Sequence, residues 1–543
     1  MLAKRAWLLL FVAVCAAVFY GLGAAPLVGA DEPRYAQVAR EMYTRGDWVT
    51  PTLGGHDWFE KPALLYWMAA AGYWLFGETE TGARLGAALA GLASMLLVWA
   101  LARRVEFEAG ERLRGFGFVG GAVAASSAGL LVFSRAANFD VLLTATVTAA
   151  LACFFMSENE RTPMGRQRFL VGFYAAVGLS LLAKGLAGAV LPGGVVLLYF
   201  FLRGRLPNLL RLGVWWGVPL CLLVAAIWYG PVIARHGRVF VDEFFVQHHF
   251  ARYVSNKYHH PQPFYFYFPV MLMLALPWTA FLLSGLRGVF ESNWRAEDAE
   301  SRLSAFAFAW LLVPVVFFSL SGSKLPGYVL PALPGAALLA GRRVHKYLRG
   351  EGETLTMRLT GALALALCAA GGYFFYKSGG GRGVPEWAAA LVLAPALVCG
   401  LLALVAPGRR MQCFMATAFG SLLTAVLIAA LALAPLAERE SVRGLLRRAD
   451  SEGFAGRPVY QLHTIERSSE FYAAGRLAYD PQGEPWKFEG VRDLMQAVRA
   501  AGGRGLVLVP RRHADQLENV EGLEAKHLGD NGQLALVGVT VKE

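Results

Sequence analysis

The chain has 543 residues, of which 56% are hydrophobic and only 17% charged, and its mean hydropathy is +0.44. Soluble domains carry about 25% charged residues, so this composition excludes an ordinary soluble protein. The net charge is +12, but residues 438–543 hold 15 basic and 16 acidic residues. The basic excess therefore belongs to the apolar part of the chain, where basic residues in the loops are expected from membrane topology. The net charge thus gives no indication of nucleic-acid binding.

Apolar segments recur along most of the chain, and many approach the roughly 20 residues that cross a hydrocarbon core of about 30 Å as a helix. Thirteen can be placed, at residues 6–26, 82–102, 116–134, 139–156, 169–183, 186–202, 212–234, 264–286, 303–320, 327–341, 359–376, 386–406 and 412–435. The pattern predicts an all-α polytopic membrane protein with about 13 transmembrane helices.

Basic residues concentrate in every second connection between these segments. They lie at 103–114, 161–168, 203–211, 287–302, 342–349 and 409–410. The positive-inside rule places these connections in the cytoplasm. The outer face then receives residues 27–81, 135–140, Lys184, 235–263, 321–326 and the tail.

The outer segment 27–81 is too long for a turn. Residues 33–43 are typical of a short helix, and residues 58–75 are rich in aromatic side chains, which favour the headgroup region. We expect two interfacial helices within about 32–78. The alternative is one more spanning helix, which would invert every later loop.

The composition becomes that of a soluble domain after Pro435. Residues 458–462, 505–509 and 534–541 are strand-like, and residues 466–474 and 491–501 are helix-like. We predict a transmembrane domain over residues 1–436 and a small extracytoplasmic α/β domain over residues 437–543.

The strongest cluster of charges is Asp31-Glu32-Pro33-Arg34-Tyr35-Ala36, directly after the first apolar segment. Charged groups at a membrane boundary are costly unless they are solvated, paired or functional. A helix cap at Asp31, ahead of Pro33, is the alternative explanation. Capping accounts for one of the acids but not for the whole set.

Further polar residues recur on the same face, namely Glu60-Lys61, Arg135 with Asp140, a loop rich in histidines and Ser323-Lys324. Arg135 and Asp140 could form a purely structural pair, and Lys61 could simply extend to the interface. Five of the ten histidines lie between residues 236 and 260. Their spacing does not match a tetrahedral zinc pattern, so metal binding stays open.

Six motifs now stand in order on one face: DEPRYA with GDW, FEKPALLYW, the aspartate at 140, KG at 184–185, HHFARY with HHPQPF, and SKLPGY. Together they resemble the C-type membrane glycosyltransferases, in particular the 4-amino-4-deoxy-L-arabinose lipid A transferase branch, which is related to the protein mannosyltransferases. The resemblance runs from Lys4 to about Pro435.

The resemblance implies an inverting transfer of one sugar from a polyprenyl phosphate, such as undecaprenyl phosphate, on the periplasmic side of the inner membrane. Asp31 matches the catalytic acid and Asp140 the second acidic position. The expected phosphate-binding residues are Arg34, Lys61, Arg252 and, as a further outer lysine, Lys324. Glu60 with His248 or His260 would hold a divalent metal ion, and no nucleotide cofactor is expected.

Three functions remain open. The first is sugar transfer to lipid A, and the second is a protein O-glycosyltransferase using the same kind of donor. The third is a transporter of lipid-linked sugars, which would place charges near the bilayer midplane and often shows repeats. The charges here concentrate at one interface, which favours an enzyme.

Overall fold

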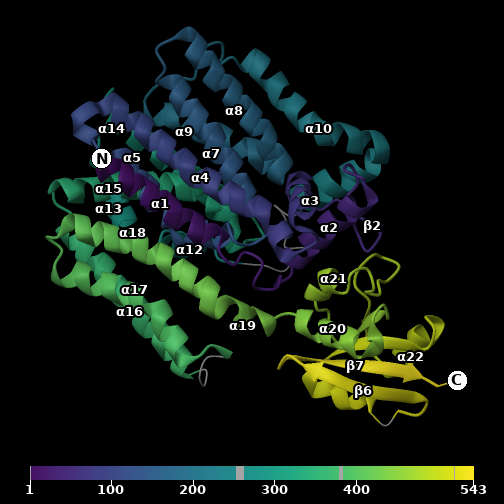
Figure 1. The fold of residues 1–543 in the computed structure, drawn as a ribbon. Coiled ribbons are helices and arrows are strands. Elements are labelled where there is room, and N and C mark those ends of the chain that lie inside the picture. Colours follow the sequence, from purple (N-terminus) through teal and green to yellow (C-terminus); the bar gives the residue numbers. More distant parts are fainter. Residues whose placement is uncertain (1, 252–261, 378–382, 519, 543) are drawn as a thin grey trace.

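The computed structural model describes residues 2–251, 262–377, 383–518 and 520–542. Most of the described chain is helical, and a small sheet lies at its C-terminal end (Figure 1). Seven described helices are long and apolar enough to cross a membrane: α4 (Glu80–Ala109), α7 (Phe139–Glu158), α10 (Val214–Val241), α14 (Ala299–Ser319), α16 (Thr354–Lys377), α17 (Glu386–Val405) and α18 (Arg410–Leu427). The protein is therefore an integral membrane protein, as its composition predicts.

Shorter, broken or less apolar helices complete the bundle. The pair α12 (Tyr267–Leu274) and α13 (Thr279–Phe290) is bent by 118° around Pro277 and would count as an eighth span if it crosses as one unit. The others are α1 (Leu2–Phe19), α5 (Phe116–Ala125), α6 (Ala128–Phe133), α8 (Pro163–Lys184), α9 (Ala187–Leu202) and α15 (Leu333–Arg349). Every predicted apolar segment coincides with a helix or a broken pair, but the number that crosses stays a prediction.

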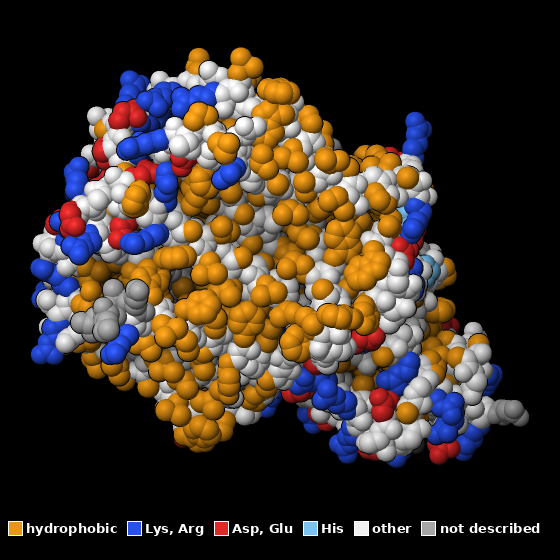
Figure 2. All heavy atoms as spheres, turned by 45° about the horizontal axis from the view of Figure 1, so that its top comes forward, with side chains coloured by type: hydrophobic (Ala, Val, Ile, Leu, Met, Phe, Trp, Pro, Cys, Tyr) orange, Lys and Arg blue, Asp and Glu red, His pale blue; other side chains and the backbone are white. Residues whose placement is uncertain are grey.

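The basic connections meet at one end of the bundle. Arg104 Nη2 lies 3.3 Å from Glu160, Arg302 Nη2 lies 3.1 Å from Glu108, and Arg349 donates to the carbonyls of Glu111 and Arg112. We call this region, residues 103–114, 158–168, 203–211, 287–302, 342–353 and 409–410, the basic end. Figure 2 shows basic side chains gathered at the left and upper left beside a broad hydrophobic surface.

The opposite end, which we call the site end, holds two further helices and a hairpin. They are α2 (Glu32–Arg45), α3 (Leu64–Phe76), β1 (Thr52–Leu53) and β2 (His56–Asp57). Pro33 in the first turn of α2 and the left-handed Gly46 after it fix the helix boundaries. The two helices expected within the first outer segment are thus present.

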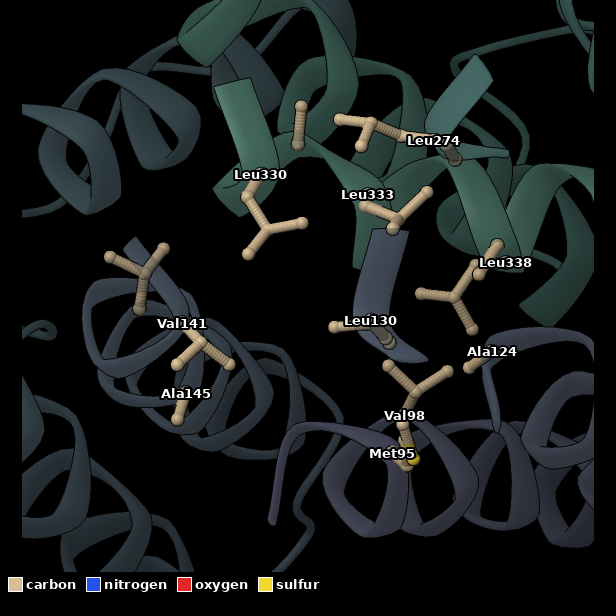
Figure 3. Close-up of a cluster of buried hydrophobic side chains, with 14 of the residues drawn as sticks. Met95, Val98, Ala124, Leu130, Val141, Ala145, Leu274, Leu330, Leu333 and Leu338 are labelled. Carbon is tan, nitrogen blue, oxygen red and sulfur yellow. The ribbon is translucent and has the colours of Figure 1, made fainter. Parts of the chain in front are cut away.

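The core of the bundle lies where α6, α7 and α15 pack on the 3-10 helix η3 (Pro326–Ala332), with α4 packed against α6, α7 and α15 (Figure 3). Leu130, Val141, Leu330 and Leu333 are all fully buried there. This packing holds η3 against the start of α7, which places Gly327 beside Asp140.

The C-terminal domain is a five-stranded mixed sheet in the order β4-β3-β5-β7-β6. Its strands are β3 (Val459–Leu462), β4 (Lys487–Phe488), β5 (Arg504–Pro510), β6 (Leu523–Asp530) and β7 (Leu534–Val541), and its helices are α20 (Arg443–Ala449), α21 (Ser468–Tyr472) and α22 (Val491–Ala500). The helix α19 (Leu433–Glu438) leads into it. The predicted α/β architecture is confirmed. Two strands are not predicted by the sequence, namely β6, which is largely exposed, and β4, which has only two residues.

Candidate active site

The two acids that begin the DEPRYA motif have different environments. Glu32 is 7% exposed and accepts hydrogen bonds from Arg84 at 2.8 and 2.9 Å and from the Ala137 N–H at 2.9 Å. Asp31 is exposed, and its side chain makes no capping bond to α2. Glu32 is therefore structural, and the capping explanation does not account for Asp31.

Arg34 joins three parts of the chain. Its Nη1 lies 3.7 Å from Glu60 Oε2, its Nε lies 3.6 Å from Glu470 Oε2, and its guanidinium lies 5.1 Å from the Trp58 ring centre. Burial lowers the pKa of Arg34, but the carboxylates of Glu470 and Glu60 more than offset this and raise it above the usual value. Arg34 is thus a permanent cation in a site that is largely closed to water.

Several polar atoms around Arg34 are buried and have no hydrogen-bond partner among the described residues. They are Arg34 Nε, Trp58 Nε1, Tyr66 Oη and Glu470 Oε2. Buried polar groups are nearly always paired in folded proteins. Arg34 Nε and Glu470 Oε2 face each other at 3.6 Å, which is an ion pair but too long for a hydrogen bond. A polar ligand at this place would therefore gain hydrogen bonds.

Glu470 comes from α21 of the C-terminal domain and was not expected in the site. It is 1% exposed, and burial raises the pKa of its carboxyl group although Arg34 and Arg467 oppose this. The same helix is anchored to α2, because Arg40 donates to the Phe471 carbonyl at 2.6 Å. No feature of the tail sequence distinguished Glu470 from the other acids.

Lys61 lies next to this cluster and is mostly buried. Its ammonium group donates to Glu60 Oε1 at 2.8 Å. The structure thus brings Arg34, Glu60 and Lys61 together at the site end, as the sequence predicts.

Asp140 forms the second part of the site. Its carboxylate accepts a hydrogen bond from the ammonium group of Lys184, which lies 4.0 Å from the centre of the Tyr328 ring. Arg135 does not pair with Asp140, contrary to the structural alternative, because it donates to the carbonyls of Ala17, Val18 and Tyr20. The sequence places Lys184 on the outer face at the end of an apolar helix but does not predict its pairing with Asp140.

An aromatic cluster connects the two parts. The centre of the Tyr35 ring lies 4.8 Å from that of Phe139 and 6.4 Å from that of Tyr66. The ring centres of Phe139 and Tyr66 are 5.5 Å apart. These contacts fix α2, α3 and the start of α7 relative to one another. Arg34 and Asp140 are each next in sequence to a member of this cluster.

Lys324 is 7% exposed and donates to the carbonyls of Ser321 at 2.7 Å and Gln262 at 3.1 Å. No ion pair of Lys324 is found within the described ranges. These two carbonyls hold the ammonium group at the site end, and its role in phosphate binding stays a prediction.

The predicted residues of the histidine-rich loop lie largely outside the described part. Arg252 and His260 fall in the undescribed range 252–261, and the His248 side chain is likewise not described. Within the described ranges, no group of three His, Cys, Asp or Glu side chains is placed to hold a metal ion. The metal site therefore stays a prediction.

The fold has close matches among solved membrane-protein structures. It matches the crystal structure of ArnT from Cupriavidus metallidurans bound to undecaprenyl phosphate with a TM-score of 0.80, at 22% identity over 98% of both chains. The apo structure of the same protein matches with a TM-score of 0.77 at 23% identity, over 99% of this chain and 98% of that one. Residues 60–229 match the family described as dolichyl-phosphate-mannose-protein mannosyltransferase.

Curated relatives agree with this fold. The chain is 35% identical over 327 residues to undecaprenyl phosphate-alpha-4-amino-4-deoxy-L-arabinose arabinosyl transferase 1 of Pseudomonas fluorescens, covering 59% of this chain and 54% of the relative. It is 33% identical over 370 residues to the corresponding transferase of Pseudomonas paraeruginosa, covering 67% and 64%. The chain spans less than two thirds of the length of either relative. Their similarity confirms the resemblance inferred from the motifs.

Proposed function

We propose that this protein transfers 4-amino-4-deoxy-L-arabinose from undecaprenyl phosphate to lipid A on the periplasmic side of the inner membrane. The observation that carries the proposal is the assembly of Arg34, Lys61 and the Asp140–Lys184 pair at the end opposite the basic end. The names of the curated relatives supply the sugar and the lipid carrier.

The reaction breaks the bond between the anomeric carbon and the donor phosphate while an acceptor oxygen attacks. Negative charge grows on the leaving phosphate, and Arg34 and Lys61 supply the positive charge that stabilises it. Asp31 is exposed and does not cap α2, so its carboxylate is able to accept a proton from the acceptor or to orient it. Asp140, held by Lys184, positions a reactant, and attack from the face opposite the phosphate inverts the anomeric centre.

No step is assigned to a divalent metal. Of its proposed ligands only the Glu60 side chain is described, and its two oxygens face Lys61 and Arg34. A metal ion at Glu60 would compete with these cations for the same carboxylate. Arg34 and Lys61 already supply the charge that the leaving phosphate requires.

The acceptor is tested by mass spectrometry of lipid A and of envelope glycoproteins from cells with and without the protein. We expect aminoarabinose on lipid A only when the protein is present. Sugar on envelope proteins instead would favour the protein O-glycosyltransferase, which the match to the mannosyltransferase family supports. If cells without the protein still make both products, both transferase functions are refuted.

The phosphate site is tested with Lys61→Ala. One charge-assisted contact contributes about 1.5 to 3 kcal/mol, so binding of polyprenyl phosphate should weaken by about one to two decades. Lys377→Ala, which removes a cation at the end of α16, is the matched control and should bind as wild type. Equal affinity of the Lys61 variant and wild type would remove this residue from the phosphate site.

The orientation is tested with single cysteines in a cysteine-free background. His56 and Gln482 are exposed at the site end and in the C-terminal domain, and Met164 and Glu351 are exposed at the basic end. An impermeant thiol reagent applied to intact spheroplasts should label the first two positions only. The opposite pattern would place the site in the cytoplasm and rule out a periplasmic transfer.

A further inference from the structure

An apolar cavity of about 340 Å³ lies among α6, α16, α17 and α18 and the bend between α12 and α13, and its described lining includes none of the charged residues of the site. Small side chains line much of it, including Gly361, Ala364, Ala396 and Gly420. All of the described lining residues are uncharged. A cavity of this size and character takes an apolar group, and such cavities exclude water.

The helices around the cavity are loosely attached to the bundle. Only 11% of the most apolar stretch of α16 and of α18 is buried, whereas 67% of that of α7 is buried. The cavity is therefore bounded by helices that face lipid, and a lipid chain can reach it sideways.

A groove continues from the cavity toward the basic end. It lies between α13 and α16, is lined by Thr279, Leu283, Arg287 and Thr356, and shares Leu363 with the cavity. Along α13 the groove runs from Thr279 to Arg287, a rise of about 12 Å at 1.5 Å per residue. One leaflet of the hydrocarbon core measures about 15 Å, so the groove has the length of one lipid leaflet.

The polar end of the groove is basic. Arg287 is the charged residue among its described lining; its side chain is 83% exposed and lies 3.0 Å from Glu291. Arg343 and Lys346 line a second cavity, of about 230 Å³, which borders the same turns of α13. The two linings together hold four basic residues and one acidic residue, Glu291, which lies near Arg287 and Arg343. This end therefore has an excess of positive charge, as a phosphate headgroup requires.

We propose that the cavity and groove bind one anionic diacyl phospholipid of the cytoplasmic leaflet, with its phosphate near Arg287 and one acyl chain ending in the cavity. A chain that enters from the basic end passes along α13 and reaches the cavity at the level of the α12–α13 bend. The isoprenyl tail of a donor would have to enter from the other leaflet, because its phosphate belongs at the site end. The lipid fills space that would otherwise leave α16 to α18 poorly packed.

The test uses the purified full-length protein and native mass spectrometry with deuterated phosphatidylglycerol. Wild type should retain one lipid, and Ala364→Phe, which fills the cavity from α16, should weaken retention at least tenfold. Ala366→Phe is the matched control, because Ala366 is exposed on the same helix and does not line the cavity. Ala396→Phe fills the cavity from α17 and should weaken lipid retention to the same extent. Agreement between the two phenylalanine variants would show that the filled cavity, and not misfolding of one variant, causes the lost binding.

The headgroup is tested by substitution at the basic end. Arg287→Gln should reduce the preference for phosphatidylglycerol over a zwitterionic lipid by about fivefold, the effect of one basic residue near a membrane surface. Arg161→Gln, an exposed arginine elsewhere at the basic end, should leave the preference unchanged. In a variant whose only cysteine is Cys368, which lines the cavity, bound lipid should slow labelling by N-ethylmaleimide.

Two results would overturn the proposal. Retention of phosphatidylglycerol by both phenylalanine variants at wild-type affinity would show that the lipid lies elsewhere. Displacement of the bound lipid by undecaprenyl phosphate, in one-for-one competition, would show that the cavity holds the tail of a polyprenyl lipid. Neither result depends on transfer activity, so the proposed function is tested separately.

Discussion

Replacing Gly327 by alanine should disturb Asp140 while leaving the backbone conformation unchanged. A Cβ atom at Gly327 would lie 2.1 Å from Asp140 Oδ2 and 2.7 Å from the Phe133 ring. Ordinary contact begins at 3.4 Å, so the carboxylate must move by about 1.3 Å. Gly327 lies in η3 and is not among the glycines with positive φ, so alanine can adopt its backbone.

The expected cost follows from this displacement. A misplacement of about 1 Å of a group in an active site can cost about 100-fold in rate, and overpacking of a close-packed site costs about 1 to 3 kcal/mol in stability. We therefore expect Gly327→Ala to lower turnover by about two decades while the protein still folds. The Lys184 ion pair would be stretched or broken by the same movement.

The assay is the rate of sugar transfer by purified protein at saturating donor, together with the midpoint of thermal unfolding. Gly230→Ala is the matched control, because no atom lies within 4 Å of the Cβ position at Gly230. That variant should keep wild-type turnover and stability. Turnover of Gly327→Ala within threefold of wild type would show that the position of Asp140 does not matter for the reaction.

Three further predictions concern charged groups at the site end. Asp31→Asn should abolish transfer and change the free energy of unfolding by less than about 0.5 kcal/mol, measured by thermal unfolding; retained turnover would exclude Asp31 from the mechanism. Glu32→Gln should instead destabilise the protein by about 3 to 5 kcal/mol, because Arg84 is left buried without its partner, and an unchanged unfolding midpoint would contradict this. Burial raises the pKa of the Glu470 carboxyl group although Arg34 opposes this. The folded protein therefore binds a proton at Glu470 more tightly than the unfolded chain does. As a result, the free energy of unfolding increases as pH falls through the pKa of Glu470 in the folded protein. Glu470→Gln should remove this contribution, and identical pH slopes of stability in both proteins would refute it.

The sequence predicted the elements better than the contacts. Apolar segments and alternating basic connections depend on local composition, so the helices and the grouping of the basic connections could be inferred. The pairing of Asp140 with Lys184 rather than Arg135 depends on how α7 and α8 pack, which no spacing reveals. The sequence likewise could not predict that Glu470 lies beside Arg34, because only the packing of α21 on α2 brings the two together.

The structure also separates the charges that serve folding from those that remain for a ligand. Arg84 directs five hydrogen bonds of 2.7 to 2.9 Å at Glu32 and at the carbonyls of residues 22, 25 and 26, as a buried cation must to offset its lost hydration. Arg34 is nearly as buried, but its nearest carboxylates lie 3.6 and 3.7 Å away and its Nε has no hydrogen-bond partner in the described chain. A cation kept only for stability would be costly in this state. A phosphate oxygen between Arg34 and Lys61 would supply the missing short contacts, so the incomplete pairing of Arg34 is itself an argument for an anionic substrate.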